Sequence, residues 1–206
     1  MLALRRRSPL RLSPEPDGPA LALGRAHEAS GPARRVFAAL AAGRLSGPVI
    51  WAQGPQTEGR LDPEGLLAFF DPGRLVVARC RGGVDALWTA EEALRSGAAP
   101  LVVVEPPAPP ALTPVRRLNL AAEVGAEKAG GGGPLCLILT PEGGSAAAVE
   151  TRWRVEPLPG WASAPPSAGG GPARWRLTLL RDKAGPPGVW EMGERQGAAP
   201  AFSRAA

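Results

Sequence analysis

The chain has few of the residues that build metal sites, disulfides and nucleotide-binding loops. It has two cysteines, one histidine and two lysines among 206 residues. Cys80 and Cys136 lie far apart in apolar runs, whereas a zinc site needs about four closely organised ligands and a disulfide scaffold needs more cysteine. We therefore expect no metal and no disulfide, and two free, buried thiols in a reducing compartment.

The chain also lacks long hydrophobic segments. No stretch approaches the roughly 20 apolar residues that span a bilayer. Three arginines, Arg5 to Arg7, stand near the beginning, but no apolar run follows them as it does in a secretory signal. These features predict a cytoplasmic protein that has no membrane partner.

Glycine, proline and arginine are in excess. The 27 glycines and 25 prolines make up a quarter of the chain, and they cluster in a way that assigns them to loops and ends. The formal net charge is +5, and all but two of the 24 basic residues are arginine. This balance favours an anionic partner, nucleic acid first, although a GC-biased genome equally produces few lysines with much alanine, glycine and proline.

Aliphatic runs and amphipathic helical patterns alternate over the first two thirds of the chain. The clearest helix is 84–96, for which Val84, Leu87, Trp88 and Leu94 are predicted to form the core stripe. Arg74–Cys80 is predicted to be a strand buried on both faces. Such continuous aliphatic strands separated by helices predict an α/β fold with a mainly parallel sheet flanked by helices.

The last third has a different pattern. Residues 148–156, 173–181 and 188–192 alternate with a period of two, which is typical of antiparallel strands. Proline, glycine and serine fill 157–172, which we expect to be a flexible loop. The predicted organisation is a flexible basic arm at 1–20, one domain at 21–192 that contains this loop, and a disordered tail at 193–206.

A short segment has the outline of a phosphate-binding loop. It follows a predicted strand, Gly24–His27, and precedes a predicted helix, Ala33–Leu45. Such loops need a lysine for the phosphates and a serine or threonine for magnesium. Pro32 and Ala33 stand at these two places, and proline also removes a backbone N–H from the loop. On local features alone, an ordinary strand-to-helix turn with the proline as the first helical residue explains the pattern better. The residues of this degenerate loop are Glu28, Ser30, Gly31, Pro32 and Ala33.

The order of elements resembles the RecA-type ATPase core. Glu28–Gly31 lies between strand and helix, Leu101–Glu105 is a later strand, and antiparallel strands come at the end. More narrowly, the chain resembles the ImuA family, the RecA-like and sometimes SulA-like accessory proteins of the bacterial translesion-synthesis mutasome. The segments that carry this second resemblance are Ala86–Gly97, Arg116–Glu123, Thr151–Val155 and Trp175–Arg181.

The resemblance implies a nucleoid-associated protein made in the SOS response to DNA damage. It implies a non-enzymatic role in error-prone synthesis: binding of ImuB, a polymerase-like subunit, with contacts to RecA or single-stranded DNA. An error-prone α-type subunit of DNA polymerase III would be an indirect partner.

The resemblance also maps the nucleotide site onto this chain. The lysine position falls on Pro32, the magnesium-binding threonine on Ala33, and the catalytic glutamate near Gln53. Glu105 matches the acidic residue of the second nucleotide motif. We therefore expect no bound cofactor and no ATP hydrolysis.

Arg34 and Arg35 stand in the first turn of the predicted helix, where positive charge opposes the helix dipole. A bound anion that remains from the nucleotide site, an acidic segment of a partner or solvent would offset this unfavourable interaction.

Two Arg-Trp-Arg repeats are the main candidate for a nucleic-acid or partner surface. Alternate side chains of a strand share a face, so pairing of the two strands would line one surface with four arginines. Phosphates or carboxylates would have to intervene between them. The alternative is that both tryptophans are core and the arginines only solvate the other face. The candidate residues are Arg152, Arg154, Arg174, Arg176, Arg181 and Lys183.

Two other functions are compatible with the sequence. One is a SulA-like inhibitor of cell division, which co-purification would distinguish from a polymerase accessory protein. The other is a residual DNA-dependent ATPase with an atypical loop. A hydrolase fits worse, because the chain has no G-x-S-x-G motif and its one histidine, His27, has only Ser30 nearby in sequence.

Overall fold

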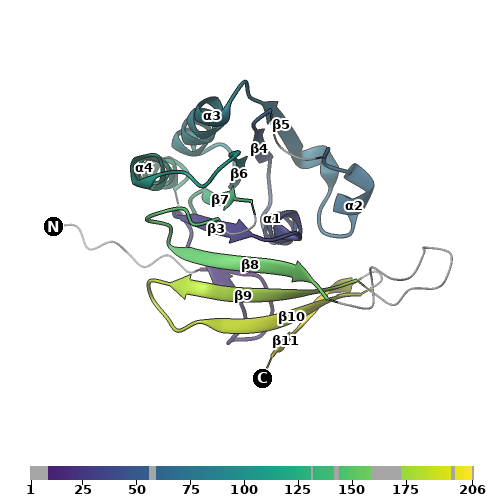
Figure 1. The fold of residues 1–206 in the computed structure, drawn as a ribbon. Helices are drawn as coiled ribbons and strands as arrows, with labels where there is room; N and C mark the ends of the chain where they lie inside the picture. Colours follow the sequence, from purple (N-terminus) through teal and green to yellow (C-terminus); the bar gives the residue numbers. More distant parts are fainter. Residues whose placement is uncertain are drawn as a thin grey trace.

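The computed structural model describes residues 9–55, 59–130, 132–141, 144–158, 173–195 and 198–205. Its central feature is a nine-stranded mixed sheet that has helices on both faces (Figure 1). The strands of this sheet are β3 (Ala26–Ser30), β4 (Val49–Gln53), β5 (Leu75–Arg79), β6 (Leu101–Glu105), β7 (Leu135–Leu139), β8 (Thr151–Pro157), β9 (Arg174–Asp182), β10 (Gly188–Arg195) and β11 (Ala198–Arg204).

The sheet has a parallel part and an antiparallel part. The strand order is β11-β10-β9-β8-β3-β7-β6-β4-β5. The strands from β8 to β5 in this order are parallel to one another, and β9, β10 and β11 continue the sheet in antiparallel fashion. This arrangement confirms the predicted α/β fold, a mainly parallel sheet flanked by helices with antiparallel strands after it.

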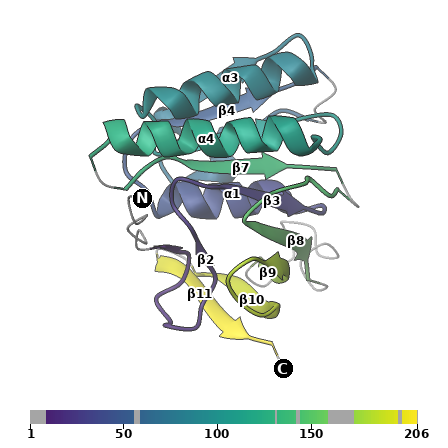
Figure 2. The ribbon, with the colours of Figure 1, turned by 90° about the vertical axis from the view of Figure 1, so that its left-hand side faces the viewer.

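Four helices cover the two faces of the parallel part. α1 (Arg34–Gly43) and α2 (Pro63–Leu67) share one hydrophobic core, and a 3-10 turn at Pro72–Arg74 leads from α2 into β5. α3 (Gly83–Ser96) and α4 (Leu112–Lys128) share the core on the opposite face, and they lie side by side over the sheet (Figure 2). Among the described residues, no helix has the length and apolar character needed to cross a bilayer.

The close contact between α3 and α4 depends on a glycine. Gly97 ends α3 with φ of +71°, and a Cβ there would lie 2.6 Å from the carbonyl oxygen of Gly125 in α4. The left-handed conformation and the lack of space both require glycine at this position.

The antiparallel strands bury one face against α1, the segment after α2 and an N-terminal hairpin. A small hairpin, β1 (Leu10–Arg11) and β2 (Ala20–Leu21), belongs to the same core as these strands. Leu12 and Leu21 are fully buried, and the Trp190 indole N–H donates to the carbonyl of Asp17 at 3.2 Å. The predicted arm at 1–20 is therefore wrong for its described part, because the hairpin is needed to cover the apolar face.

The C-terminal part also differs from the prediction. β11 pairs with β10, so the chain does not become a disordered tail at residue 193. Most of the predicted flexible loop at 157–172 lies outside the described residues.

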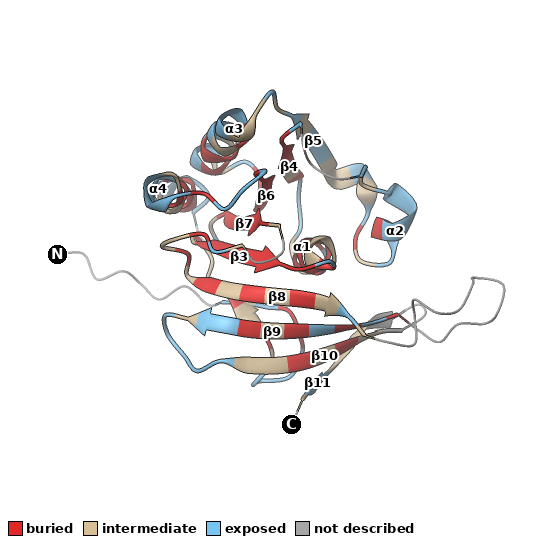
Figure 3. Cartoon of the chain, viewed as in Figure 1, coloured by how far each residue is buried: buried red, intermediate tan, exposed pale blue. Residues whose placement is uncertain are grey.

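Two elements are far more exposed than their apolar sequences predicted. β5 is an edge strand whose Val76 and Val77 are 51% and 37% exposed (Figure 3). On α3, Val84 is 81% and Trp88 is 60% exposed. The apolar side chains of α3 that are buried against the sheet are Ala86, Ala90 and Leu94, and Leu87 packs on the same core while it is partly exposed. The predicted core positions of Leu87 and Leu94 are therefore confirmed, and those of Val84 and Trp88 are wrong.

The cysteines are free, as predicted. Burial raises the pKa of the Cys136 thiol to about 12, which keeps it in the unreactive thiol form. Cys80 is only half-buried, and its Sγ lies 3.5 Å from Thr89 Oγ1.

Candidate functional site

The connection between β3 and α1 is shorter than a phosphate-binding loop. β3 continues to Ser30 and α1 begins at Arg34, so only Gly31, Pro32 and Ala33 lie between them. The expected strand, Gly24–His27, was placed too early, and the helix begins one residue after its expected start. The first half of the predicted loop is therefore strand, which leaves little chain to surround a phosphate.

The neighbouring strand β8 uses the polar groups of this connection. The Ala33 N–H donates to the carbonyl of Val155 at 3.1 Å, and Ser30 Oγ donates to the carbonyl of Trp153 at 3.1 Å. Gly31 has φ of +93°, and a Cβ there would lie 2.5 Å from the same Val155 carbonyl oxygen. The connection is thus fitted to the backbone of β8, and Pro32 has no N–H to offer.

Glu28 is a buried strand residue and not part of a loop. Its side chain is fully buried and accepts hydrogen bonds from the Thr140 hydroxyl at 2.8 Å and the Ala146 N–H at 2.9 Å. It also forms an ion pair with Arg152, whose Nε lies 2.7 Å from Glu28 Oε2. Glu28 therefore anchors β8 and the segment before it to the centre of the sheet.

The acidic position of the second nucleotide motif is engaged by the protein itself. Glu105, at the carboxyl end of β6, is 3% exposed. Arg35 contacts both of its carboxylate oxygens, at 2.7 Å from Nε and 3.1 Å from Nη2, and Gln53 Nε2 donates at 2.8 Å. Glu105 thus balances the charge of Arg35 in the first turn of α1, and the sequence analysis did not include a carboxylate of the same chain among its possibilities.

The two Arg-Trp-Arg repeats place their tryptophans and arginines on opposite faces, as predicted. Trp153 is fully buried and Trp175 is 7% exposed. The repeats do not stand opposite each other, however. Arg154 pairs in register with Thr178, and Arg176 pairs with Glu156.

Carboxylates lie between the arginines of this face. Arg154 Nε is 3.0 Å from Glu156. Glu191, on β10, bridges Arg174 at 2.6 Å and Arg176 at 3.1 Å. We call this surface the arginine face; it consists of Arg152, Arg154, Arg174, Arg176 and Arg181 with Glu28, Glu156 and Glu191.

The two remaining candidates differ from each other. Arg181 is the register partner of Arg152 and is exposed, and no carboxylate among the described residues pairs with it. Lys183 lies beyond the end of β9, where its ammonium contacts Glu150 at 3.3 Å and the carbonyl of Ala148 at 3.2 Å. The arginine face has five arginines and three carboxylates, so its positive surplus is two charges.

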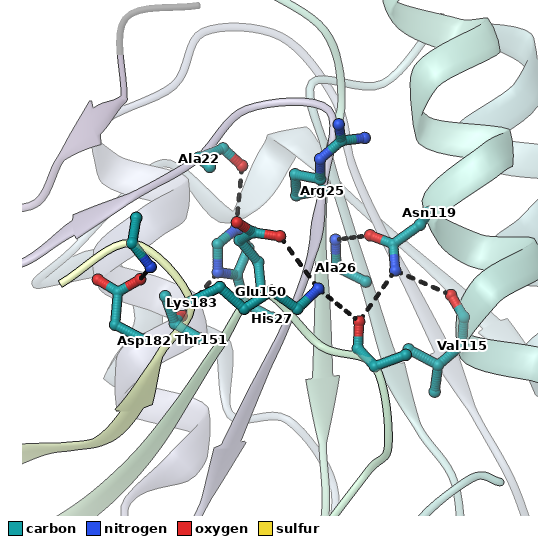
Figure 4. Close-up of polar contacts among 12 residues, drawn as sticks. Ala22, Arg25, Ala26, His27, Val115, Asn119, Glu150, Thr151, Asp182 and Lys183 are labelled. Carbon is teal, nitrogen blue, oxygen red and sulfur yellow. Dashed lines mark hydrogen bonds and ion pairs between the residues drawn. The ribbon is translucent and has the colours of Figure 1, made fainter. Parts of the chain in front are cut away.

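Other polar residues, for which the sequence predicted no structural role, fix β3 in place (Figure 4). His27 Nε2 contacts the carbonyl of Ala22 at 2.9 Å, and its Nδ1 contacts the Thr151 hydroxyl at 2.7 Å. The Trp153 indole donates to the same hydroxyl at 2.7 Å. Burial lowers the pKa of His27 from 6.5 to about 4. A neutral imidazole that donates through Nε2 and accepts at Nδ1 satisfies this chain of contacts. His27 and Ser30, three residues apart, also lie on opposite faces of β3.

Asn119 connects α4 to β3. Its Oδ1 accepts from the Ala26 N–H at 2.9 Å, and its Nδ2 donates to the carbonyls of Val115 and Ala148 (Figure 4). One turn further along α4, Glu123 forms an ion pair with Arg25. The segment Arg116–Glu123, which contributed to the resemblance, therefore holds polar residues with structural roles.

The fold and the β3–α1 connection define an α/β protein in which β8 engages Ser30 and Ala33 and Arg35 engages Glu105. No protein-family model matches the chain. Protein ImuA from two strains of Caulobacter vibrioides is 37% identical to it over 159 residues, which cover 71% of this chain and 60% of the relative. The chain is therefore similar to ImuA over most of its length, and it spans about 60% of the length of these curated relatives.

Proposed function

We propose that the chain is a non-catalytic accessory protein of error-prone translesion DNA synthesis in the SOS response. In this proposal it acts by binding an ImuB-type polymerase homologue. The chain would also contact RecA or single-stranded DNA. It would associate with the error-prone α-type subunit of DNA polymerase III only indirectly. The 37% identity to Protein ImuA supports this assignment.

One observation supports the proposal that the chain is not a catalyst: Arg35 and Gln53 both bind the carboxylate of Glu105. Phosphoryl transfer depends on a cation and backbone donors that hold the phosphates, and on a metal held by acidic and hydroxyl groups. Here the carboxylate is already neutralised by a bidentate arginine. The loop donors of Ser30 and Ala33 are directed to β8. Binding of Mg-ATP would have to break these contacts first.

Two measurements test the proposal. The tagged chain is co-expressed with the ImuB homologue of the same genome and purified, and we expect the two proteins to elute together. Titration of the purified chain with millimolar Mg-ATP in a calorimeter should give no saturable heat.

The outcomes separate the rival functions. Retention of a division protein in place of the polymerase homologue would favour the SulA-like alternative. Saturable heat with Mg-ATP that disappears in Glu105→Gln would instead favour the residual ATPase.

A further inference from the structure

The parallel side of the sheet ends in an uncovered strand. β5 pairs with β4 over the whole register from Val49↔Leu75 to Gln53↔Arg79, and it is the last strand on that side. Its residues are exposed or half-buried, which contrasts with the fully buried β3, β6 and β7 (Figure 3).

The register shows which backbone groups of β5 face outward. The Cys80 N–H donates to the carbonyl of Gln53 in β4 at 2.8 Å. Backbone groups of alternate residues point to the same side of a strand, so Val76 and Ala78 also face β4. The N–H and C=O groups of Val77 and Arg79 therefore point away from the sheet, where another strand would bind.

This edge lacks most of the features that normally protect an edge strand. Natural edges are shielded by charge, proline, bulges or a covering element. From Leu75 to Ala78, β5 has an apolar run without proline, and its register with β4 shows no bulge. Val76 and Val77 are 51% and 37% exposed, and no strand of the described residues pairs with the outer edge of β5.

The charges near the edge indicate what kind of segment would fit. Arg79 ends the strand and Arg81 follows it, and both are exposed. Neither forms an ion pair within the part of the chain that the structure describes. Carboxylates on an added strand would satisfy them. Antiparallel pairing of two copies of β5 would instead set Arg79 of one copy beside the Arg74 end of the other.

We infer that the edge of β5 binds an extended, apolar segment of a partner protein as a tenth strand, with acidic residues of that segment next to Arg79 and Arg81. Main-chain hydrogen bonds to Val77 and Arg79 would supply affinity, and alternate side chains and the terminal charges would supply specificity. This inference rests on the proposed function, because it assigns a surface to the partner binding that the function requires.

The sharpest test is a proline that removes only an outward-facing donor. Val77→Pro deletes the N–H that an added strand would use, while the ladder to β4 uses Val76 and Ala78 and is kept. Val77→Thr is the matched control, because it keeps the N–H and the β-branched shape. The probe is a fluorescein-labelled peptide with an alternating valine–threonine centre and two aspartates at each end, and its binding is followed by fluorescence anisotropy.

We expect saturable binding to the natural chain and to Val77→Thr, and at least a ten-fold weaker affinity for Val77→Pro. The double variant Arg79→Glu/Arg81→Glu should prefer a peptide in which lysines replace the aspartates. Thermal melting checks that each variant is folded, and the charge-reversed variant remains a test if Val77→Pro does not fold.

Equal affinity of the natural chain and folded Val77→Pro would overturn the inference, as would the absence of saturable binding to the natural chain. A dimer of the natural chain that Val77→Pro abolishes would assign the edge to a second copy and would also overturn it. A natural chain that retains the polymerase homologue but not the peptide would reject this surface and leave the proposed function intact.

Discussion

At the scale of single residues, buried carboxylates determine what several arginines do. Glu28, Glu91 and Glu105 are each less than a tenth exposed. Each is paired with at least one arginine, and Glu91 binds both Arg95 and Arg117. Since a buried charge is very unfavourable without a partner, these arginines are required by the fold. An excess of arginine in the sequence is therefore weaker evidence for a nucleic-acid surface than it first appears.

The first prediction separates a structural arginine from exposed ones on the same face. Arg152→Ser leaves the fully buried Glu28 with an unpaired charge and should lower the free energy of unfolding by about 3–5 kcal/mol. Arg176→Ser breaks a largely exposed pair with Glu191 and should cost less than about 1 kcal/mol. Urea unfolding of the three proteins measures the difference. Equal losses would contradict the structural role of Arg152.

The second prediction concerns pH and His27. Because the pKa of His27 is lowered from 6.5 to about 4 in the folded chain, the unfolded chain takes up a proton first as the pH falls. The stabilisation is fully present above pH 6.5, and it is lost as the pH falls towards 4. The loss from this one group should reach roughly 3 kcal/mol.

Urea unfolding between pH 7 and pH 4 measures this dependence, and His27→Gln is the control. Glutamine does not titrate and still offers an N–H towards the carbonyl of Ala22. Carboxylates also titrate in this range, so the difference between the two proteins is the relevant quantity. Parallel curves for the natural chain and the variant would refute the assignment.

At the scale of elements, the sequence predicts the type of most helices and strands but not their exposure. The strand at 101–104, the helix at 84–96 and the late antiparallel strands all appear, since period and turn residues are local signals. The exposure of β5 was missed because an apolar run has the same appearance in a central strand and at an edge. The arm was missed because the burial of its hairpin depends on residues far along the chain, including Trp190. The tail was missed although β11 pairs with the preceding strand, β10.

The third prediction tests the corrected core of α3. Trp88 is 60% exposed, so Trp88→Ser should change the free energy of unfolding by less than about 1 kcal/mol. Leu94 is fully buried, and Leu94→Ala should cost about 2–5 kcal/mol. Chemical denaturation of both variants measures the contrast. A large decrease in the free energy of unfolding of Trp88→Ser would mean that Trp88 belongs to the core, as the sequence alone predicted.

At the scale of the whole molecule, the parallel and antiparallel parts of the sheet depend on each other. The β3–α1 connection is fitted to β8, and β8 begins the antiparallel part. The residue types of Pro32 and Ala33 led to the prediction that this connection binds no nucleotide, and this stays a prediction. The sequence could not predict that Arg35 engages Glu105 or that Val155 approaches Gly31, because these contacts join segments far apart in the chain.

The fourth prediction addresses single-stranded DNA. Arg174 and Arg176 are the most exposed paired members of the arginine face, with side chains 55% and 46% accessible. If both contact phosphates, Arg174→Ser/Arg176→Ser should weaken binding of an oligonucleotide and reduce the slope of log affinity against log salt by about 1.4. Fluorescence anisotropy at several salt concentrations measures both quantities. Arg60→Ser/Arg116→Ser removes the same charge elsewhere and should leave the slope almost unchanged. If the two double variants lose equal affinity, net charge alone explains the binding and the arginine face is not the contact surface.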